Sequence, residues 1–302
     1  MLKTFFALFS ALASFCALAA EQIPAARGLL LDAAKVGQTI IAVGERGHIV
    51  RSTDSGRSWE LLDSPTGATL TGIFFADELV GWAVGHDGVI LKTRDSGLSW
   101  TLQHDDKTVS FLDILAIDNQ RAYAVGSFGT FYDTHDGGTT WTQRRVSEQD
   151  SHLNRIIATK SGLHFIAGER GTLLRAAHYN QAFIPTSTGY EGSFFGVLPL
   201  GENALLAYGL RGHVYRSEDA GLTWVPVKIE STALIMTAVK LKDGVIVLTG
   251  QARAFSVSHD DGHTFHAWQP GLTTAVAELL EAPDGTLLAF GEAGATRLPK
   301  PE

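Results

Sequence analysis

The stretch "STDSGRSW", residues 52–59, recurs along the chain with the same order of residue types. Its copies are "TRDSGLSW" at 93–100, "THDGGTTW" at 134–141, "SEDAGLTW" at 217–224 and "SHDDGHTF" at 258–265. The closing aromatics Trp59, Trp100 and Trp141 are 41 residues apart, and so are Trp224 and Phe265. A weaker copy, "AAHYNQAF" at 176–183, fills the remaining gap. The chain is therefore built on a repeat of about 41 residues.

A second landmark, a glycine fifteen residues before each closing aromatic, gives the phase of the repeat. The column reads Gly44, Gly85, Gly126, Gly168, Gly209, Gly250 and Gly291. Short apolar segments precede and follow each landmark, a third lies further back, and a fourth begins at the aromatic, with turn residues between them. Four strands per period and seven periods predict an all-β, seven-bladed β-propeller of four-stranded blades. A solenoid of stacked sheets is the alternative, although its repeats are usually shorter.

The ends of the chain bear on how the ring closes. The seventh repeat has only three strands, the last being "ATRLP", and the chain stops where its fourth would begin. One period before "SWELL", only residues 20–23 could supply that missing strand.

The first twenty residues differ from the rest. Lys3 precedes an apolar run over residues 5–20 that ends in "ALAA", which is typical of a cleaved secretory signal. We therefore expect a signal peptide at 1–20, a propeller at 21–302, and an exported, periplasmic protein. A membrane anchor and a lipoprotein modified at Cys16 are the alternatives. Cys16 is the only cysteine, so the mature chain would have no disulfide, thiol nucleophile or thiolate metal site.

The aspartate of the repeated motif favours a structural role. A turn carboxylate can accept backbone N–H bonds, the glycine two positions later tolerates positive φ, and a tryptophan buries a large area between blades. The residues are Asp54, Asp95, Asp136, Asp219 and Asp260, with Trp59, Trp100, Trp141 and Trp224. Residues related by blade repetition lie on a ring, too dispersed to act together. We expect no catalytic residue here; the motif resembles the BNR or Asp-box repeat.

Seven such blades over residues 21–302 resemble the photosystem II stability and assembly factor family. The resemblance implies a non-catalytic scaffold or assembly factor that binds a membrane protein complex or its subunit. We further expect a monomer without cofactor or metal, peripheral to a membrane at most, in the thylakoid lumen if the organism is photosynthetic. The formal net charge of −8 argues against nucleic acid as a partner.

Arginines in the turn between the second and third strands are the candidate partner-binding residues. They lie in "GERG" at 44–47, "GERG" at 168–171 and "GLRG" at 209–212, which place Arg46, Arg170 and Arg211 on the face opposite the Asp boxes. A second basic column, four positions beyond the second glycine, contains Arg51, Lys92, Arg175 and Arg216. The alternatives are a basic patch that binds a client, as the family resemblance implies, and ordinary solvated charge.

Two other functions are compatible with such a chain. One is an accessory protein of an envelope transporter, and the other is a sialidase-like glycan-binding or glycoside hydrolase propeller. The chain lacks the Arg-Ile-Pro segment of sialidases, and Tyr190 and Glu191 are adjacent in sequence, so they would point to opposite sides of a strand. In "HDDGHTFH", His259, His263 and His266 have spacings that a metal site could use, but the repeat already explains this segment as an Asp box.

Overall fold

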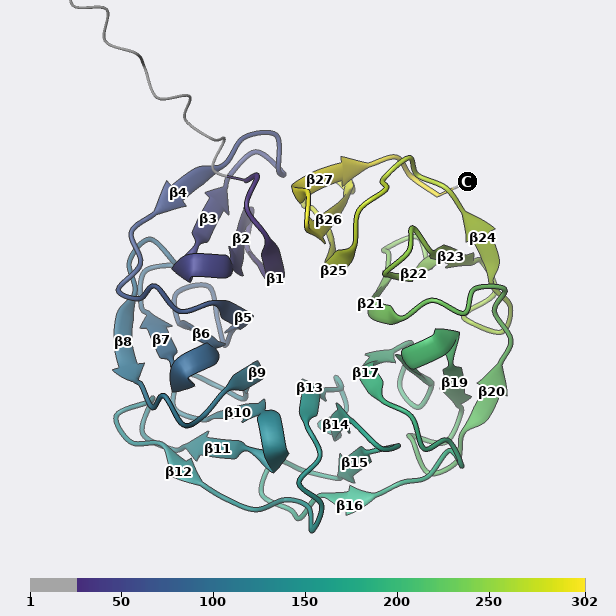
Figure 1. The fold of residues 1–302 in the computed structure, drawn as a ribbon, viewed down its shortest axis with the longest axis horizontal. Helices are drawn as coiled ribbons and strands as arrows, with labels where there is room; N and C mark the ends of the chain where they lie inside the picture. The colour runs from purple at the N-terminus through teal and green to yellow at the C-terminus, as the bar shows by residue number, and fades with distance from the viewer. Residues whose placement is uncertain (1–25, 302) are drawn as a thin grey trace, which may run out of the picture.

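A computed structural model describes residues 26–301 as seven antiparallel sheets arranged in a ring around an axis (Figure 1). Six sheets have four strands and the seventh has three, and within each sheet the strands follow chain order from the axis outward. This confirms the predicted all-β, seven-bladed propeller. The predicted signal peptide at residues 1–20 and the predicted closing strand at 20–23 lie outside the described residues.

The strand bounds follow the repeat. Blade 1 contains β1 (Leu30–Val36), β2 (Thr39–Gly44), β3 (Ile49–Ser52) and β4 (Glu60–Leu62), and blade 2 contains β5 (Leu70–Phe75), β6 (Gly81–Gly85), β7 (Ile90–Thr93) and β8 (Thr101–His104). Blade 3 contains β9 (Phe111–Ala116), β10 (Ala122–Gly126), β11 (Phe131–Thr134) and β12 (Thr142–Gln143), and blade 4 contains β13 (Leu153–Ala158), β14 (His164–Gly168), β15 (Leu173–Ala176) and β16 (Ile184–Pro185). Blade 5 contains β17 (Phe194–Pro199), β18 (Leu205–Gly209), β19 (Val214–Ser217) and β20 (Val225–Val227), and blade 6 contains β21 (Ile235–Lys240), β22 (Ile246–Gly250), β23 (Phe255–Ser258) and β24 (His266–Trp268). Blade 7 contains β25 (Val276–Glu281), β26 (Leu287–Gly291) and β27 (Gly294–Leu298).

The core lies between neighbouring blades. In the second strand of blades 2 to 7 every residue is buried, because adjacent sheets cover both of its faces. Trp82 of blade 2, for example, packs with Phe111 and Tyr132 of blade 3. This two-sided burial explains why these strands are apolar at consecutive positions instead of alternating with polar residues.

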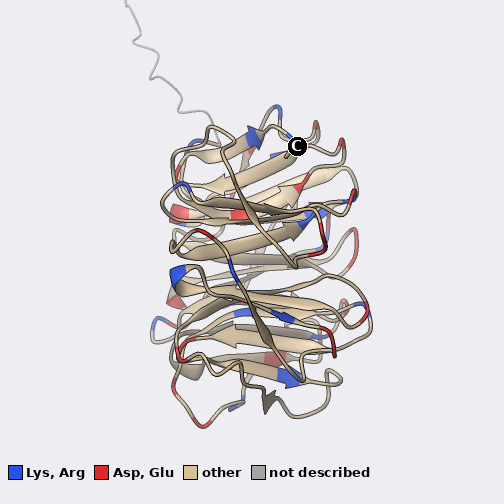
Figure 2. Cartoon of the chain, turned by 90° about the vertical axis from the view of Figure 1, so that its right-hand side faces the viewer, with Lys and Arg blue, Asp and Glu red and all other residues tan. Residues whose placement is uncertain are grey.

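The disc has two faces with different turns. On one face, which we call the 3-10 face, η1 (Glu45–Gly47), η2 (His86–Gly88), η3 (Ser127–Gly129) and η4 (Leu210–Gly212) join the second strand of a blade to the third. The Asp boxes join the third strand to the fourth on the other face, which we call the Asp-box face. Seen edge-on, charged residues lie mostly in the turns at these two faces (Figure 2). Residues 26–301 contain no helix with the length and apolarity needed to cross a bilayer.

The ring closes where blade 7 meets blade 1. β1 lies against β25 and β26, and apolar side chains from both blades form one cluster around Leu30, Leu288 and Phe290. The Trp59 ring of blade 1 meets the Phe290 ring edge-on at 5.8 Å between centroids. The backbone N–H of Ala295 donates to the carbonyl oxygen of Ala26 at 3.0 Å. The start of the described chain therefore lies beside β27.

Candidate functional site

The carboxylate of each intact Asp box binds groups of its own turn. The Asp54 Oδ1 accepts hydrogen bonds from the Ser52 hydroxyl at 2.8 Å and from the backbone N–H of Ser58 at 2.9 Å, and its Oδ2 accepts from the Ser58 hydroxyl at 2.6 Å. The other four boxes repeat this pattern. Bonds from Thr140 lower the pKa of Asp136 to about 2. These contacts make the box a brace for the third-to-fourth strand turn.

The second basic column joins neighbouring blades. In three blades a Lys or Arg side chain on the third strand donates a hydrogen bond to a backbone carbonyl oxygen of the next blade. That oxygen belongs to the residue directly after the box aspartate. Lys92 Nζ reaches Gly137 at 2.5 Å, Arg175 Nε reaches Ala220 at 2.8 Å, and Arg216 Nε reaches Asp261 at 3.0 Å. Arg51 holds the same position, with its Nη1 at 3.9 Å from the Glu60 carboxylate. The partner-binding role of Arg51, Arg175 and Arg216 stays a prediction, and the hydrogen bonds give Arg175 and Arg216 a bracing role. The Arg216 side chain is only 7% exposed.

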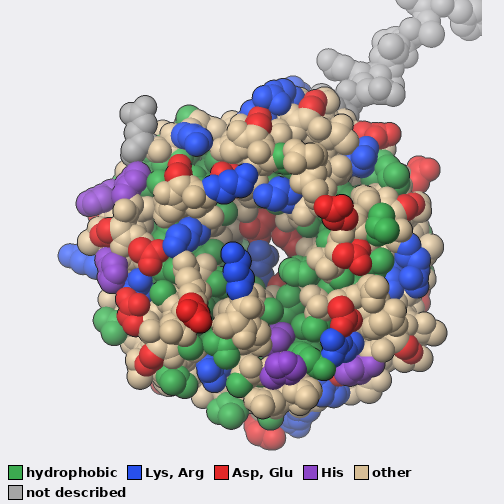
Figure 3. Space-filling view, turned by 180° about the vertical axis from the view of Figure 1, so that it is seen from behind, with side chains coloured by type: hydrophobic (Ala, Val, Ile, Leu, Met, Phe, Trp, Pro, Cys, Tyr) green, Lys and Arg blue, Asp and Glu red, His purple; other side chains and the backbone are tan. Residues whose placement is uncertain are grey.

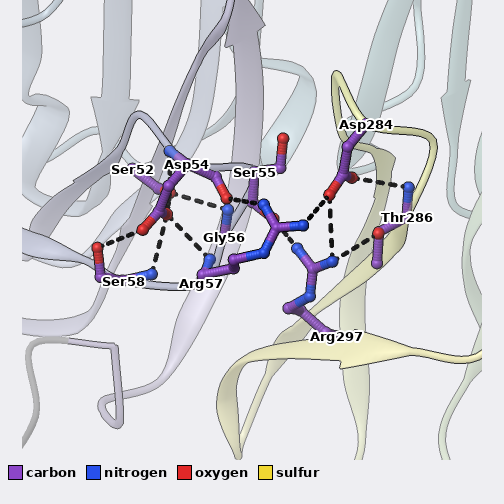
Figure 4. A network of polar contacts seen from close by, with 9 residues as sticks. All are labelled: Ser52, Asp54, Ser55, Gly56, Arg57, Ser58, Asp284, Thr286 and Arg297. Carbon is purple, nitrogen blue, oxygen red and sulfur yellow. Dashed lines mark hydrogen bonds and ion pairs between the residues drawn. The ribbon is translucent and has the colours of Figure 1, made fainter.

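The same brace closes the ring through Arg297, which the sequence analysis missed. Arg297 Nη1 donates to the carbonyl oxygen of Ser55 in blade 1, and its Nη2 donates to Thr286 Oγ1 at 2.7 Å and to Asp284 Oδ2 at 3.2 Å (Figure 4). Arg57 of blade 1 donates to the same Asp284 oxygen at 2.9 Å. Two arginines from opposite sides of the blade 7–blade 1 interface thus share one carboxylate.

A cluster of charged side chains lies at the axis of the ring. One residue of each innermost strand, directly after a register shift, occupies an equivalent position: Asp32, Gly72, Asp113, Arg155, Gly196, Thr237 and Glu278. Arg155 Nη1 lies 3.8 Å from Asp32 Oδ1, its Nε lies 3.8 Å from Asp113 Oδ2, and its Nη2 donates to Glu278. The guanidinium therefore links blades 1, 3 and 7 to blade 4, and we call these four residues the axial cluster.

Burial decides the electrostatics of the axial cluster. Three carboxyl groups face one guanidinium, so full ionisation would leave unpaired negative charge in a poorly hydrated space. Burial raises the pKa of Asp113 to about 6, opposed by the charge of Arg155, and burial also raises the pKa of Asp32 well above its usual value. A cavity of about 420 Å³ borders the cluster. The Asp-box face opens at its centre, where acidic side chains are visible (Figure 3).

The predicted arginines of the 3-10 face are exposed and share one backbone conformation. Arg46, Arg170 and Arg211 have φ values of 54°, 54° and 57°, in the left-handed region that residues other than glycine, asparagine and aspartate seldom adopt. Each is the central residue of the turn after β2, β14 or β18. The structure therefore places all three on one face, opposite the Asp boxes. Arg170 and Arg211 come from successive blades, and Arg46 lies three blades away.

A fourth arginine of this face was not selected from the sequence. Arg253 follows β22 in blade 6, is exposed, and has a φ of 58° beside Ala252 at 57°. It stands in place of the second glycine that the other six repeats carry. Arg170, Arg211 and Arg253 thus project from three consecutive blades, 4, 5 and 6. The sequence signal that could have identified Arg253 is that it replaces a glycine that recurs at this position of the repeat.

The histidines of the blade 6 Asp box do not make a metal site in the described structure. Residues 26–301 hold no group of three His, Cys, Asp or Glu side chains placed to bind a metal ion. His263 Nε2 instead lies 3.9 Å from Glu218 Oε1 of the neighbouring blade.

Fold and faces together define a ring-closed Asp-box propeller with an axial charge cluster and a face of exposed arginines. A protein-family model described as photosynthesis system II assembly factor YCF48 matches residues 93–287, which is more than half of the chain. The chain therefore belongs to the YCF48 family of photosynthesis system II assembly factors, as the sequence resemblance indicated. None of the curated proteins compared with it matches.

Solved structures agree on the fold. The chain is similar to a structure titled "YCF48 bound to D1 peptide", with a TM-score of 0.73 and 20% identity over 92% of this chain and 95% of that one. It is also similar to YCF48 from Cyanidioschyzon merolae, with a TM-score of 0.73 and 14% identity over 90% and 96% of the two chains. The WD40 propeller domain of Doa1 has a TM-score of 0.70 and 12% identity, over 91% and 93%.

Proposed function

We propose that this protein is a non-catalytic assembly factor that binds a subunit of a membrane protein complex through its 3-10 face. Membership of the YCF48 assembly factor family carries the proposal. The similar YCF48 structure with a bound D1 peptide supports a polypeptide segment as the ligand class. These comparisons favour the assembly factor over the transporter and glycan alternatives.

The chemistry of the 3-10 face supports the choice of surface. Arg170, Arg211 and Arg253 are exposed cations in left-handed turns of an otherwise acidic chain. A left-handed backbone is unfavourable for such side chains, so folding alone does not account for arginine there. Exposed guanidinium groups are well suited to carboxylates on a partner.

The absence of catalysis is part of the same proposal. The box carboxylates accept bonds from their own turns, and their lowered pKa values make them poor proton donors. The axial carboxyl groups are buried around Arg155. We further propose an exported monomer, made with a cleaved signal at residues 1–20 and peripheral to the membrane.

A charge-reversal experiment tests the proposal. The variant R46E/R170E/R211E changes only exposed turn residues, so its folding should be almost unchanged. Affinity capture of the tagged protein from detergent-solubilised membranes should then lose the client subunit. The matched control K35E/K160E/K242E makes the same change of charge in exposed strand hairpins on the Asp-box face. If R46E/R170E/R211E captured as much client as the control variant, a binding role for the 3-10 face would be contradicted.

A further inference from the structure

Phe128 is an exposed aromatic residue in a backbone conformation that disfavours it. It is the central residue of η3, has a φ of 53°, and is 75% exposed. In the corresponding turns of four other blades the central residue is charged: Arg46, Asp87, Arg170 and Arg211. A bulky side chain in the left-handed region is a genuine outlier, and here burial offers no compensation. The fold therefore gives no reason for phenylalanine at this position.

The surroundings of Phe128 combine a polar hollow with cationic side chains. A hollow of about 310 Å³ lies between η3 and the segment after β12, and Phe128, Arg144 and Arg145 are among its lining residues. The Arg145 side chain is 63% exposed; its guanidinium donates to the carbonyl oxygens of Ser147 and Glu148 and lies 3.7 Å from the fully exposed Glu148 carboxylate, which a client carboxylate would replace. The hollow is thus a preformed recess beside an apolar ring.

On its other side Phe128 connects to the turn of blade 4. The His152 ring meets the Phe128 ring edge-on at 4.8 Å between centroids. The backbone N–H of His152 donates to Glu169 Oε2 at 3.2 Å, and Glu169 directly precedes Arg170. His152 and Glu169 thus connect the Phe128 ring to the turn of blade 4 that carries Arg170.

We propose that Phe128 is the aromatic anchor of the partner-binding face. It takes an apolar side chain of a client polypeptide segment whose neighbouring carboxylates meet Arg145 and Arg170. The inference rests on the proposed function and names the chemistry of the ligand: an acidic segment interrupted by an aromatic or large aliphatic residue. Aromatic and arginine side chains together are the usual composition of energetic centres in protein interfaces.

Charge and shape favour a peptide over a membrane or a second copy. Asp87, Asp150 and Glu169 are interspersed with the arginines on this face, which weakens attraction to an anionic lipid surface. A second copy would bring the same net charge of −8 against this one. A recess flanked by cations instead suits a few side chains of an acidic strand or loop.

Variants at this position separate binding from folding. Asparagine tolerates the left-handed backbone well, so Phe128→Asn should melt at the same temperature as the parent or higher. Leu79→Asn is the matched control, because Leu79 is 57% exposed in a strand hairpin on the Asp-box face. The double variant R170E/R211E reports on the arginines independently of Phe128.

The probes are two synthetic acidic peptides of equal charge, one with a central phenylalanine–leucine pair and one with two serines there. By fluorescence anisotropy the parent and L79N should bind the apolar peptide roughly tenfold more tightly than the serine peptide. F128N should lose this discrimination and keep the weaker binding, whereas R170E/R211E should lose affinity for both peptides.

Other outcomes would overturn the proposal in distinguishable ways. Equal binding of both peptides by the parent, still lost in R170E/R211E, removes Phe128 from the site and leaves the proposed function standing. No binding of either peptide overturns the anchor and removes support for an acidic client. Phe128-dependent binding to phosphatidylglycerol vesicles, or Phe128-dependent dimerisation in sedimentation equilibrium, would assign the ring to a membrane or a second copy.

Discussion

Replacing Arg297 with methionine should weaken the ring at the blade 7–blade 1 interface specifically. The substitution keeps most of the apolar stem but removes the donor to Ser55 in blade 1 and the bonds to Thr286 and Asp284. Within the described chain no peptide bond crosses this interface, whereas a chain segment connects every other neighbouring pair of blades. In the described residues, blades 7 and 1 are held together by side-chain contacts and by the backbone hydrogen bond from Ala295 to Ala26.

The magnitude follows from the hydrogen bonds that the substitution removes. A carbonyl oxygen left without its donor costs about 1–3 kcal/mol, and each further bond contributes about 1 kcal/mol. The Arg297 side chain is 31% exposed, so water replaces part of these bonds, and Arg57 still holds Asp284. We expect a net loss of about 2 kcal/mol, which for a chain of this size lowers the melting temperature by roughly 3 °C. The apolar cluster around Leu30 and Phe290 should keep the ring assembled.

Arg175→Met is the matched control, because Arg175 makes the corresponding bond to Ala220 across the blade 4–blade 5 interface. Both variants should lose thermal stability in scanning calorimetry. Only Arg297→Met should accelerate hydrogen exchange in β25, β26 and β27, because opening at the interface exposes blade 7 first. Equal hydrogen-exchange rates of β25, β26 and β27 in the two variants would refute the view that the Arg297 contacts are important for holding blade 7 against blade 1.

Three further predictions concern the axial cluster, the 3-10 face and the Asp boxes. The pKa of Asp113 is raised to about 6 in the folded state, so protonation of Asp113 stabilises the fold below the unfolded pKa. This contribution to the free energy of unfolding is at most about 3 kcal/mol, and it is lost as pH rises from about 4 to 6. In Asp113→Asn, the free energy of unfolding measured by urea denaturation should fall less between about pH 4 and 6 than in the parent. An equally steep fall in the variant would show that another group titrates there. Arg253→Gly should raise stability by about 0.5–1 kcal/mol, because glycine suits φ 58°, while client capture falls; a variant that is destabilised would disprove the strain argument. Asp95→Asn should lower stability by about 1 kcal/mol at neutral pH. Hydrogen bonds within the box lower the pKa of Asp95, so this stabilisation is present above the unfolded pKa and is lost as pH falls. The difference in unfolding free energy between parent and variant should therefore become smaller below about pH 4. A difference that does not change with pH would contradict this prediction.

The fold could be predicted because each repeat carries its own strand and turn signals. The landmark glycines and closing aromatics recur in register, so a weak signal in one blade is supported by six others. The placement of Arg46, Arg170 and Arg211 on one face followed from strand order alone, because successive antiparallel turns alternate between the two faces.

Residues that depend on local irregularity were not predictable in this way. Arg297 belongs to the bracing column, but a two-residue turn between Gly291 and Gly294 pairs these glycines directly and moves the column by one position. The axial residues follow a register shift in each innermost strand, so their common position becomes visible only once the pairing is known. Phe128 occupies the same turn position as Arg46 and Arg170, so the repeat pattern placed it on this face, but its φ of 53° and its contact with His152 became visible only in the structure.

The repeated left-handed turn has a consequence for how this protein could change its partner. The central residue of each turn already has an unfavourable backbone conformation and contributes little to packing, so exchanging one exposed side chain for another there leaves the folding free energy nearly unchanged. Arginine, aspartate and phenylalanine all occupy it in this one chain. The 3-10 face is thus a set of positions, one in each of several blades, at which binding specificity can evolve by single substitutions without first acquiring a stabilising mutation elsewhere.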